Sequence, residues 1–260
     1  MNTAVETFRF HEFDIPIPLL NLTGGGVETF ELISQQHIAS LRKFIDLSWR
    51  DNVVEIGCGI GRDAIPLTKI LSPSATYLGT DIIKPSIEFC QAQIAARYPN
   101  FNFAHFDVDD KLHNPTGSSK MTEYVLPLAD ASVDKVFGWS VFTHMWEVDI
   151  RHYLKEFYRV LKPGGKALLT CFLITPEVLA KARETNLTQY NLRFEHQLSE
   201  HCFVNDLDFP LGAIGYSPDI FRLMVADSGL LLDREFVRGA WSGYYPDPED
   251  GQDALVLVRP

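Results

Sequence analysis

The sequence has few cysteines, no long apolar run and no internal repeat. Its four cysteines are widely spaced and form no Cys-x-x-Cys pair, which excludes a disulfide framework and a cysteine zinc site and is typical of a reducing compartment. The longest apolar stretch lies near residues 167–174, far short of the ~20 residues that a membrane helix needs. Residues 1–30 carry several acids and no secretory pattern. These absences predict a soluble cytoplasmic protein.

Positive charge is also scarce. The chain has 23 Lys and Arg against 34 Asp and Glu, a net charge of −11, and from His201 onward it has four Arg, no Lys and ten acids. Binding to nucleic acid or to an anionic membrane requires many Lys and Arg side chains. We therefore expect neither as a partner. The 260 residues, 46% of them apolar, are enough for one large globular domain with a sizeable core.

Short apolar runs alternate with helical patterns between Asn52 and Phe172. Such alternation is typical of βαβ units, in which parallel strands are joined by right-handed helical crossovers. The predicted strands are 53–56, 76–79, 101–106, 134–139 and 166–172, and the predicted helices are 60–71, 85–97 and 148–161.

The remaining segments surround this core. We expect residues 1–45 to form an N-terminal lid and helix, with Gly24–Gly26 as a joint and an amphipathic helix near 31–46. Residues 46–260 then form one domain. Its expected additions are a polar insertion at 107–125, acceptor-side insertions at 175–212 and 238–253, a helix from Ser217 to Gly229, and a terminal hairpin from 230–237 and 254–259.

A glycine-rich loop follows the first predicted strand and opens a helix, with the sequence EIGCGIG from Glu55 to Gly61. Glycines let the backbone turn tightly and let a ligand lie against the main chain. In the dinucleotide-binding fingerprint the third glycine falls one residue later, where this chain has Arg62, so the spacing favours another nucleotide. Asp81, twenty residues after Gly61, is placed to bind a ribose diol, as in both NAD and adenosyl sites.

Five motifs in register carry a family resemblance. VVEIGCGIGR at 53–62, GTD at 79–81, FDV at 106–108, the segment 126–137 and RVLKPGG at 159–165 resemble the class I S-adenosylmethionine-dependent methyltransferases in order and spacing. The small-molecule and glycan branch, with a final strand like QDALVLV, is the most similar. The resemblance implies an α/β, Rossmann-like sheet of seven mostly parallel strands, in order 3-2-1-4-5-7-6 with strand 7 antiparallel, with helices on both faces and S-adenosylmethionine as cofactor.

The resemblance also implies which residues contact that cofactor. They lie at the ends of the first four strands of the core. Those assigned to the methionine part are Glu55, Gly57, Gly59, Gly61 and Arg62, with Trp139 and Ser140 beside it; Asp81 is assigned to the ribose, and Ile82, Asp107 and the Val108 backbone to the adenine. Simpler interpretations remain open: a plain tight turn for the glycines, a solvated loop acid for Asp107 and core packing for Trp139.

A sulfonium methyl group is already activated, so the protein has to align the acceptor and exclude water. A hydroxyl acceptor also needs a general base, and His144, after the fourth core strand, is the first candidate. It can instead only shape the pocket, and His196 and His201 are alternative bases. Glu195-His196 and Glu200-His201-Cys202 have no fixed ligand geometry, so we expect no metal. Aromatic residues that wall the acceptor pocket or pack at the sheet edge are Phe8, Phe10, Phe13, Trp241, Tyr244 and Tyr245.

These observations predict a methyltransferase that modifies an O or N atom of a small molecule or sugar, with that small-molecule or glycan acceptor as a partner and no prediction of the oligomeric state. A non-catalytic S-adenosylmethionine-binding scaffold is the alternative from another class. An NAD-dependent dehydrogenase is disfavoured by Arg62 and by the motif Pro163-Gly164-Gly165.

Overall fold

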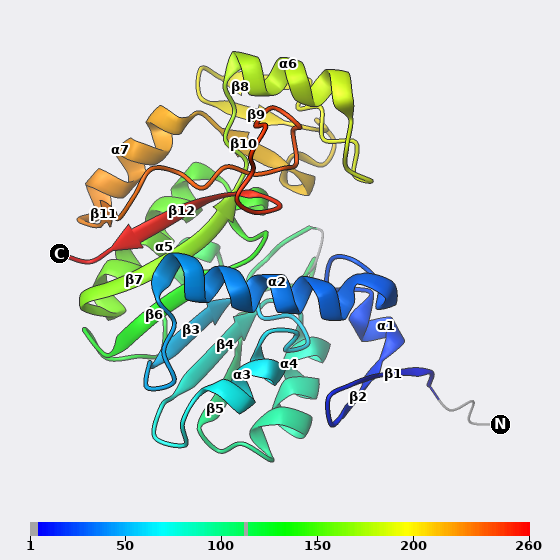
Figure 1. Ribbon diagram of the computed structural model, residues 1–260, viewed down its shortest axis with the longest axis vertical. Coiled ribbons are helices and arrows are strands. Elements are labelled where there is room, and N and C mark those ends of the chain that lie inside the picture. The colour runs from blue at the N-terminus through cyan, green and yellow to red at the C-terminus, as the bar shows by residue number, and fades with distance from the viewer. Residues whose placement is uncertain (1–4, 112–113) are drawn as a thin grey trace. The chain divides into compact units, whose positions relative to one another are not determined.

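The computed structural model describes residues 5–111 and 114–260 (Figure 1), which divide into two compact units, Met1–Ser119 and Lys120–Pro260. Seven strands form one sheet in the order β11-β12-β7-β6-β3-β4-β5. β3–β4, β4–β5 and β6–β7 pair in parallel, and β12 is antiparallel to β7 and β11. This is the predicted strand order, so the predicted fold class is confirmed. The strands are β3 (Val53–Ile56), β4 (Tyr77–Asp81), β5 (Phe101–His105), β6 (Val133–Gly138), β7 (Leu161–Cys171), β11 (Leu231–Leu232) and β12 (Asp253–Val258).

In the first unit, β3 and β4 are buried along their whole length, as expected for parallel strands covered on both faces. The helix predicted from residue 60 begins only at α3 (Ala64–Ile70). The preceding residues Gly57, Gly59 and Gly61 have φ values of 72°, 52° and 81°, which a right-handed helix does not allow. The next predicted helix starts as α4 (Lys84–Cys90) and changes to a π-helical turn, Gln91–Ala95.

The N-terminal segment of the first unit contains a hairpin that the sequence pattern did not reveal. β1 (Thr7–Phe10) pairs with β2 (Phe13–Pro16), followed by α1 (Ile17–Leu20) and α2 (Val27–Ile45). The hairpin is fastened by Glu12, which accepts hydrogen bonds from Lys69 Nζ at 2.6 Å and from the Tyr98 hydroxyl. Partial burial opposes ionisation, but these bonds lower the pKa of Glu12 to about 2. Residues 1–4 of the predicted lid, and 112–113 of the predicted polar insertion, lie outside the described residues.

In the second unit, the segment 175–212 was predicted as an acceptor-side insertion, and it has secondary structure of its own (top of Figure 1). Phe172, Phe194, Trp241 and Val178 belong to one buried apolar cluster there. Besides α5 (Glu147–Val160), the elements of the unit are α6 (Pro176–Thr185), the antiparallel strands β8 (His196–Ser199), β9 (Cys202–Val204) and β10 (Ile214–Tyr216), α7 (Pro218–Ser228), and the 3-10 turns Met121–Glu123, Phe142–His144 and Pro210–Gly212.

The predicted limits of α7 are confirmed. The Ser217 side chain caps its first turn by accepting a hydrogen bond from Ile220 N at 3.4 Å, and Gly229 ends it with φ 86°. The terminal hairpin is shorter than predicted, because β11 has only two residues. Beyond β11, Asp233 N donates to the Val256 carbonyl at 2.9 Å, and an isolated bridge joins Val237 to Ala254.

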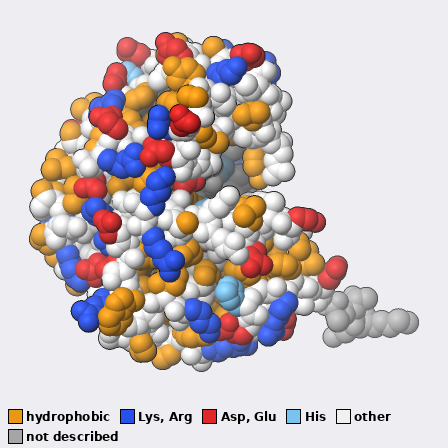
Figure 2. Space-filling view, in the orientation of Figure 1, with side chains coloured by type: hydrophobic (Ala, Val, Ile, Leu, Met, Phe, Trp, Pro, Cys, Tyr) orange, Lys and Arg blue, Asp and Glu red, His pale blue; other side chains and the backbone are white. Residues whose placement is uncertain are grey.

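The surface shows no concentrated charge on the face seen in Figure 2, where basic and acidic side chains are interspersed. Many are paired: Arg159, for example, lies 2.7 Å from Glu156 and 2.9 Å from Asp130. Of the helices in the described ranges, none has both the length and the apolar character needed to cross a bilayer.

A buried carboxylate connects three segments of the second unit. Asp253 is 0% exposed. Its Oδ2 accepts hydrogen bonds from Trp241 Nε1 at 2.6 Å and Leu173 N at 3.0 Å, and its Oδ1 accepts one from Gly239 N at 2.8 Å. Burial raises the pKa of Asp253 to about 6 despite these three donors. The side chain therefore joins the start of β12 to the exit of β7 and to the loop at 239–241.

We predict that Asp253→Ala lowers the free energy of unfolding by about 3–5 kcal/mol, because three buried donors lose their acceptor. Denaturant unfolding measures this, with Asp247→Ala, an exposed acid in the same loop, as the matched control. Equal losses in the two variants would contradict the role given to Asp253.

The same residue gives the unfolding free energy a pH dependence. The folded pKa of about 6 lies above the unfolded value of about 3.9. Between these values the folded chain holds a proton that the unfolded chain releases, so stability falls as the pH rises from 4 to 6. Asp253→Asn should remove this fall in the free energy of unfolding between pH 4 and 6, as measured by denaturant unfolding at each pH.

Candidate functional site

The glycine loop after β3 is held by the end of β4. Gly57 N donates to the Thr80 carbonyl at 2.8 Å, and Gly59 N donates to Asp81 Oδ2 at 2.7 Å. The other carboxylate oxygen of Asp81 accepts from Ile83 N at 2.8 Å. The predicted ribose ligand thus also positions the loop, because one carboxylate bonds the loop and the exit of its own strand.

Two of the glycines are required by close approaches as well as by their positive φ. A Cβ on Gly61 would lie 2.5 Å from Ile94 Cδ1, so this glycine lets the loop pack against the π-helical turn. A Cβ on Gly59 would lie 3.0 Å from Thr23 Oγ1. The N-terminal segment before α2 therefore lies directly against the middle of the loop, a contact that no sequence motif indicates.

Glu55, predicted to hold the methionine part of the cofactor, is buried inside the first unit. It accepts a hydrogen bond from the Tyr77 hydroxyl. Burial, and after it the neighbouring Asp63 carboxylate, raises the pKa of Glu55 well above its ordinary value. Asp63 is itself buried, and its Oδ2 lies 2.7 Å from Nδ1 of His37 on α2. Glu55 thus joins β3 to β4, and Asp63 joins the start of α3 to α2.

The residues predicted to contact adenine lie after β4 and β5. Asp107 accepts from Ser118 Oγ at 2.7 Å and from Asn114 Nδ2 at 3.2 Å, and these hydrogen bonds lower its pKa. Its carboxylate therefore organises the turn 107–119. Val108 is buried, with its N–H bonded to the Phe106 carbonyl at 2.8 Å, and Ile82 is half-buried. Their contacts with adenine stay predictions.

In the second unit, the exit of β6 is strained. Ser140 has φ 56°, a left-handed conformation that non-glycine residues rarely adopt. Its N–H donates to Thr170 Oγ1 at 2.6 Å and its hydroxyl donates to Gln252 Oε1 at 3.1 Å, which holds the strained backbone in place. Trp139 is buried, with its ring 6.5 Å from that of Phe137. Strain of this kind is concentrated at functional sites.

The candidate base, His144, ends a 3-10 turn just after this strained residue. Its Nδ1 lies 2.7 Å from the Leu211 carbonyl oxygen. A carbonyl only accepts, so Nδ1 carries the proton and Nε2 the lone pair. The preceding Thr143 is buried, and its Oγ1 has no hydrogen-bond partner in the described part of the chain.

The alternative bases have other surroundings. His201 Nδ1 lies 2.8 Å from Oγ of Ser217, the N-cap of α7, and His196 begins β8. Over residues 5–111 and 114–260, no group of three or more His, Cys, Asp or Glu side chains is arranged to hold a metal ion.

Three of the six aromatic residues considered for the acceptor pocket pack in the interior. Phe10 and Phe13 are buried in the hairpin of the first unit, and Trp241 is buried in the second unit with Phe172 and Phe194. Phe10 also lines a pocket in the first unit, and Tyr245 lines a pocket in the second unit. The packing interpretation therefore applies to Phe10, Phe13 and Trp241.

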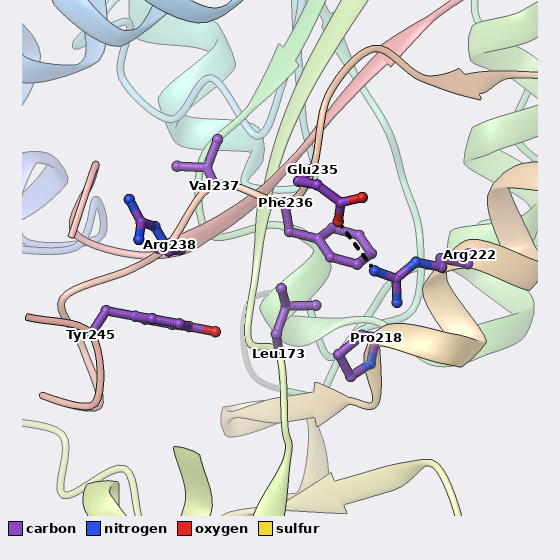
Figure 3. A pocket seen from close by; sticks show the side chains of 8 residues that line it. All are labelled: Leu173, Pro218, Arg222, Glu235, Phe236, Val237, Arg238 and Tyr245. Carbon is purple, nitrogen blue, oxygen red and sulfur yellow. Dashed lines mark hydrogen bonds and ion pairs between the residues drawn. The ribbon is translucent and has the colours of Figure 1, made fainter. Parts of the chain in front are cut away.

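That pocket, of about 310 Å³, lies in the second unit and is shown in Figure 3. Leu173, just past β7, and Phe236 give it apolar walls, and Arg222 lies 3.2 Å from Glu235 at one side. The Tyr245 hydroxyl points inward from the opposite side. The sequence pattern indicated none of these pocket residues except Tyr245, because the residues come from four separate segments without a shared motif.

Comparison with known proteins shows that part of the chain is similar to methyltransferases. Residues 53–165 match the family model described as a methyltransferase domain. A probable S-adenosylmethionine-dependent methyltransferase of Mycolicibacterium smegmatis is 29% identical over 144 residues, which cover 55% of this chain and 45% of that protein. A 27-O-demethylrifamycin SV methyltransferase of Amycolatopsis mediterranei is 30% identical over 130 residues, 48% of this chain and 40% of that protein. The chain thus matches less than half the length of either relative.

Among solved structures, a protein from Pyrococcus horikoshii OT3 superposes with a TM-score of 0.59 at 17% identity, covering 89% of this chain and 91% of that one. At this identity the likeness shows the fold, which agrees with the strand order.

We predict that Tyr77→Phe lowers the free energy of unfolding by about 1–3 kcal/mol, because the buried Glu55 carboxyl loses its donor. Glu55→Gln should be tolerated, since burial raises the pKa of Glu55 and so favours its neutral form, and an amide oxygen still accepts from Tyr77. Denaturant unfolding measures both, with the exposed Tyr190→Phe as the matched control. A severe loss in Glu55→Gln with none in Tyr77→Phe would contradict this description.

Proposed function

We propose that this chain is a class I S-adenosylmethionine-dependent methyltransferase that moves a methyl group from S-adenosylmethionine to an oxygen or nitrogen atom of a small molecule or sugar. The observation that carries the proposal is the glycine loop after β3, bonded by Gly59 N to the Asp81 carboxylate at the end of the neighbouring strand. Ligands of open α/β sheets bind at such strand ends.

The residues of the loop fit the cofactor. The positive φ of Gly57, Gly59 and Gly61 gives the loop the tight turn on which a ligand can lie. A carboxylate such as Asp81 accepts about four hydrogen bonds, which is enough for a ribose diol besides the two backbone donors. Arg62 Nε is buried without a partner among the described residues, as expected of a donor reserved for an anion. Gly57, Gly59, Gly61, Arg62 and Asp81 would hold the cofactor, which supplies a methyl group activated by a sulfonium.

The chain's own contribution to the chemistry is a proton acceptor. For a hydroxyl acceptor, we assign His144 Nε2 as the base that takes the hydroxyl proton as the acceptor oxygen forms its bond to the methyl carbon. The Leu211 carbonyl orients the imidazole and keeps the proton on Nδ1. An amine acceptor attacks once neutral and needs no such base.

The pocket of Figure 3 is our candidate for part of the acceptor site. Its aromatic walls and its Arg222–Glu235 pair suit a ring that carries hydroxyl groups, because such a ring offers a face for stacking and both donors and acceptors for the ion pair. The Amycolatopsis relative, by its name, acts on an oxygen of a small molecule, which supports this class. The free cysteines, three of them buried, support a reducing, cytoplasmic location.

We expect S-adenosylhomocysteine to raise the melting temperature of the wild-type protein and NADH to leave it unchanged. Asp81→Ala should weaken S-adenosylhomocysteine binding by about 1–3 kcal/mol, because ribose hydroxyls lose an acceptor and the loop loses its tie. Asp109→Ala, exposed in the same unit, is the control for a lost acid. A melting shift with NADH and none with S-adenosylhomocysteine would overturn the assignment.

With a hydroxyl acceptor, His144→Ala should lower kcat by about 10²–10⁴-fold and leave cofactor affinity unchanged. The wild-type rate should fall as the pH drops through the histidine pKa, and the variant should lose that dependence. His11→Ala, which changes an exposed histidine between β1 and β2, serves as the matched control. A wild-type kcat in His144→Ala would remove this residue from the chemistry.

Turnover distinguishes an enzyme from the alternative, a non-catalytic scaffold that only binds the cofactor. Formation of S-adenosylhomocysteine from S-adenosylmethionine, followed across a panel of hydroxyl and amine acceptors, supports an enzyme. Tight cofactor binding with no turnover on any acceptor would favour a binding module.

A further inference from the structure

The segment before α2 is fastened to the glycine loop at two points. Thr23 Oγ1 lies 3.0 Å from the position that a Cβ on Gly59 would occupy. One residue later, the Gly24 carbonyl accepts a hydrogen bond from Arg62 Nη1 at 2.8 Å. Arg62 is held from the other side as well, because its carbonyl accepts from Oγ of Ser34 on α2 at 3.0 Å. The Arg62 guanidinium is therefore bonded to the residue that follows Thr23.

Both side chains carry a buried donor that nothing satisfies. Thr23 Oγ1 and Arg62 Nε have no hydrogen-bond partner among the residues that the structure describes. A buried donor without an acceptor is costly, and more so when it is charged. The two donors lie on segments that the Arg62–Gly24 hydrogen bond holds together, and a carboxylate has two oxygens that can accept from both. The buried acids nearby, Glu55 and Asp63, cannot serve both donors without leaving their own partners, Tyr77 and His37.

We propose that the Thr23 hydroxyl, together with Arg62, binds the α-carboxylate of the cofactor's methionine end. Thr23 lies outside residues 53–165, the part that matches the family model, so the N-terminal segment completes the site. The inference rests on the proposed function, since it assumes that the glycine loop holds this cofactor. The bond from Arg62 to the Gly24 carbonyl then links occupancy of the site to closure of the segment.

This assignment gives the N-terminal segment a defined role. The contacts just described join the segment 17–26 to the loop through Thr23 and Gly24. Gly25 follows with φ 94°, a conformation that supports a sharp change of direction into α2. A carboxylate shared by Thr23 and Arg62 would hold this turn against the loop. A ligand that lacks the carboxylate would not.

The test compares two ligands by calorimetric titration: S-adenosylhomocysteine, which has the amino-acid end, and 5′-methylthioadenosine, which lacks it. Thr23→Val removes the hydroxyl and keeps the contact with Gly59. It should weaken S-adenosylhomocysteine about tenfold to a hundredfold, the effect of losing a hydrogen bond to a charged group, and leave 5′-methylthioadenosine unchanged. Thr23→Ser keeps the hydroxyl and should bind both ligands as the wild type does.

Thr188→Val is the matched control, because Thr188 Oγ1 is also buried without a partner in the described chain but lies in the second unit. Its binding of both ligands should equal that of the wild type. Hydrogen exchange gives a second readout: S-adenosylhomocysteine should slow exchange in peptides covering 17–26 and 5′-methylthioadenosine should not. This comparison uses the wild type and holds even if a Thr23 variant folds poorly.

Two results would overturn the inference while the proposed function stands. One is wild-type affinity of Thr23→Val for S-adenosylhomocysteine. The other is an equal loss for both ligands, which would show that Thr23 only packs on Gly59. A wild-type protein that binds neither ligand would instead overturn the proposed function, and this inference with it.

Discussion

The bond between Gly59 N and the Asp81 carboxylate is the constraint on which the candidate site depends. It joins the loop after β3 to the end of β4, two strands that pair in parallel. The loop needs this tie because its three glycines have left-handed backbones, which cost conformational entropy on folding. With the loop fixed, Gly61 packs on the π-helical turn and Gly59 meets Thr23. The same contacts that shape the loop therefore also draw the N-terminal segment onto it.

Buried carboxyl groups recur in this chain, and each is stabilised in a different way. Burial raises the pKa of Glu55, which accepts a hydrogen bond from Tyr77. Asp63 has an imidazole partner, and Asp253 has three donors from separate segments. A buried acid without such partners would cost several kcal/mol. These groups hold elements that are distant in the sequence, which apolar packing alone does not orient.

The core of the fold could be predicted because its signals are local. Buried parallel strands such as β3 are continuous apolar runs, and the Ser217 cap and Gly229 mark α7 by their chemistry. The hairpin β1–β2 was missed because its stability comes from distant partners of Glu12, which no local pattern reveals. The core of the segment 175–212 likewise forms only when Phe194 meets Trp241, 47 positions later in the sequence. The glycine motif was predictable because its residues are adjacent in the sequence. The contact of Thr23 with Gly59 was not, because the two residues lie far apart in the sequence.

The central claim is that the first unit holds the adenosyl cofactor at the loop between β3 and α3. Hydrogen exchange over the whole chain, with and without S-adenosylhomocysteine, tests it most directly. Protection concentrated in peptides covering 53–62 and 77–83 is the predicted result, because these segments carry the loop and Asp81. Protection confined to the second unit, or none in either segment at saturating ligand, would contradict the claim.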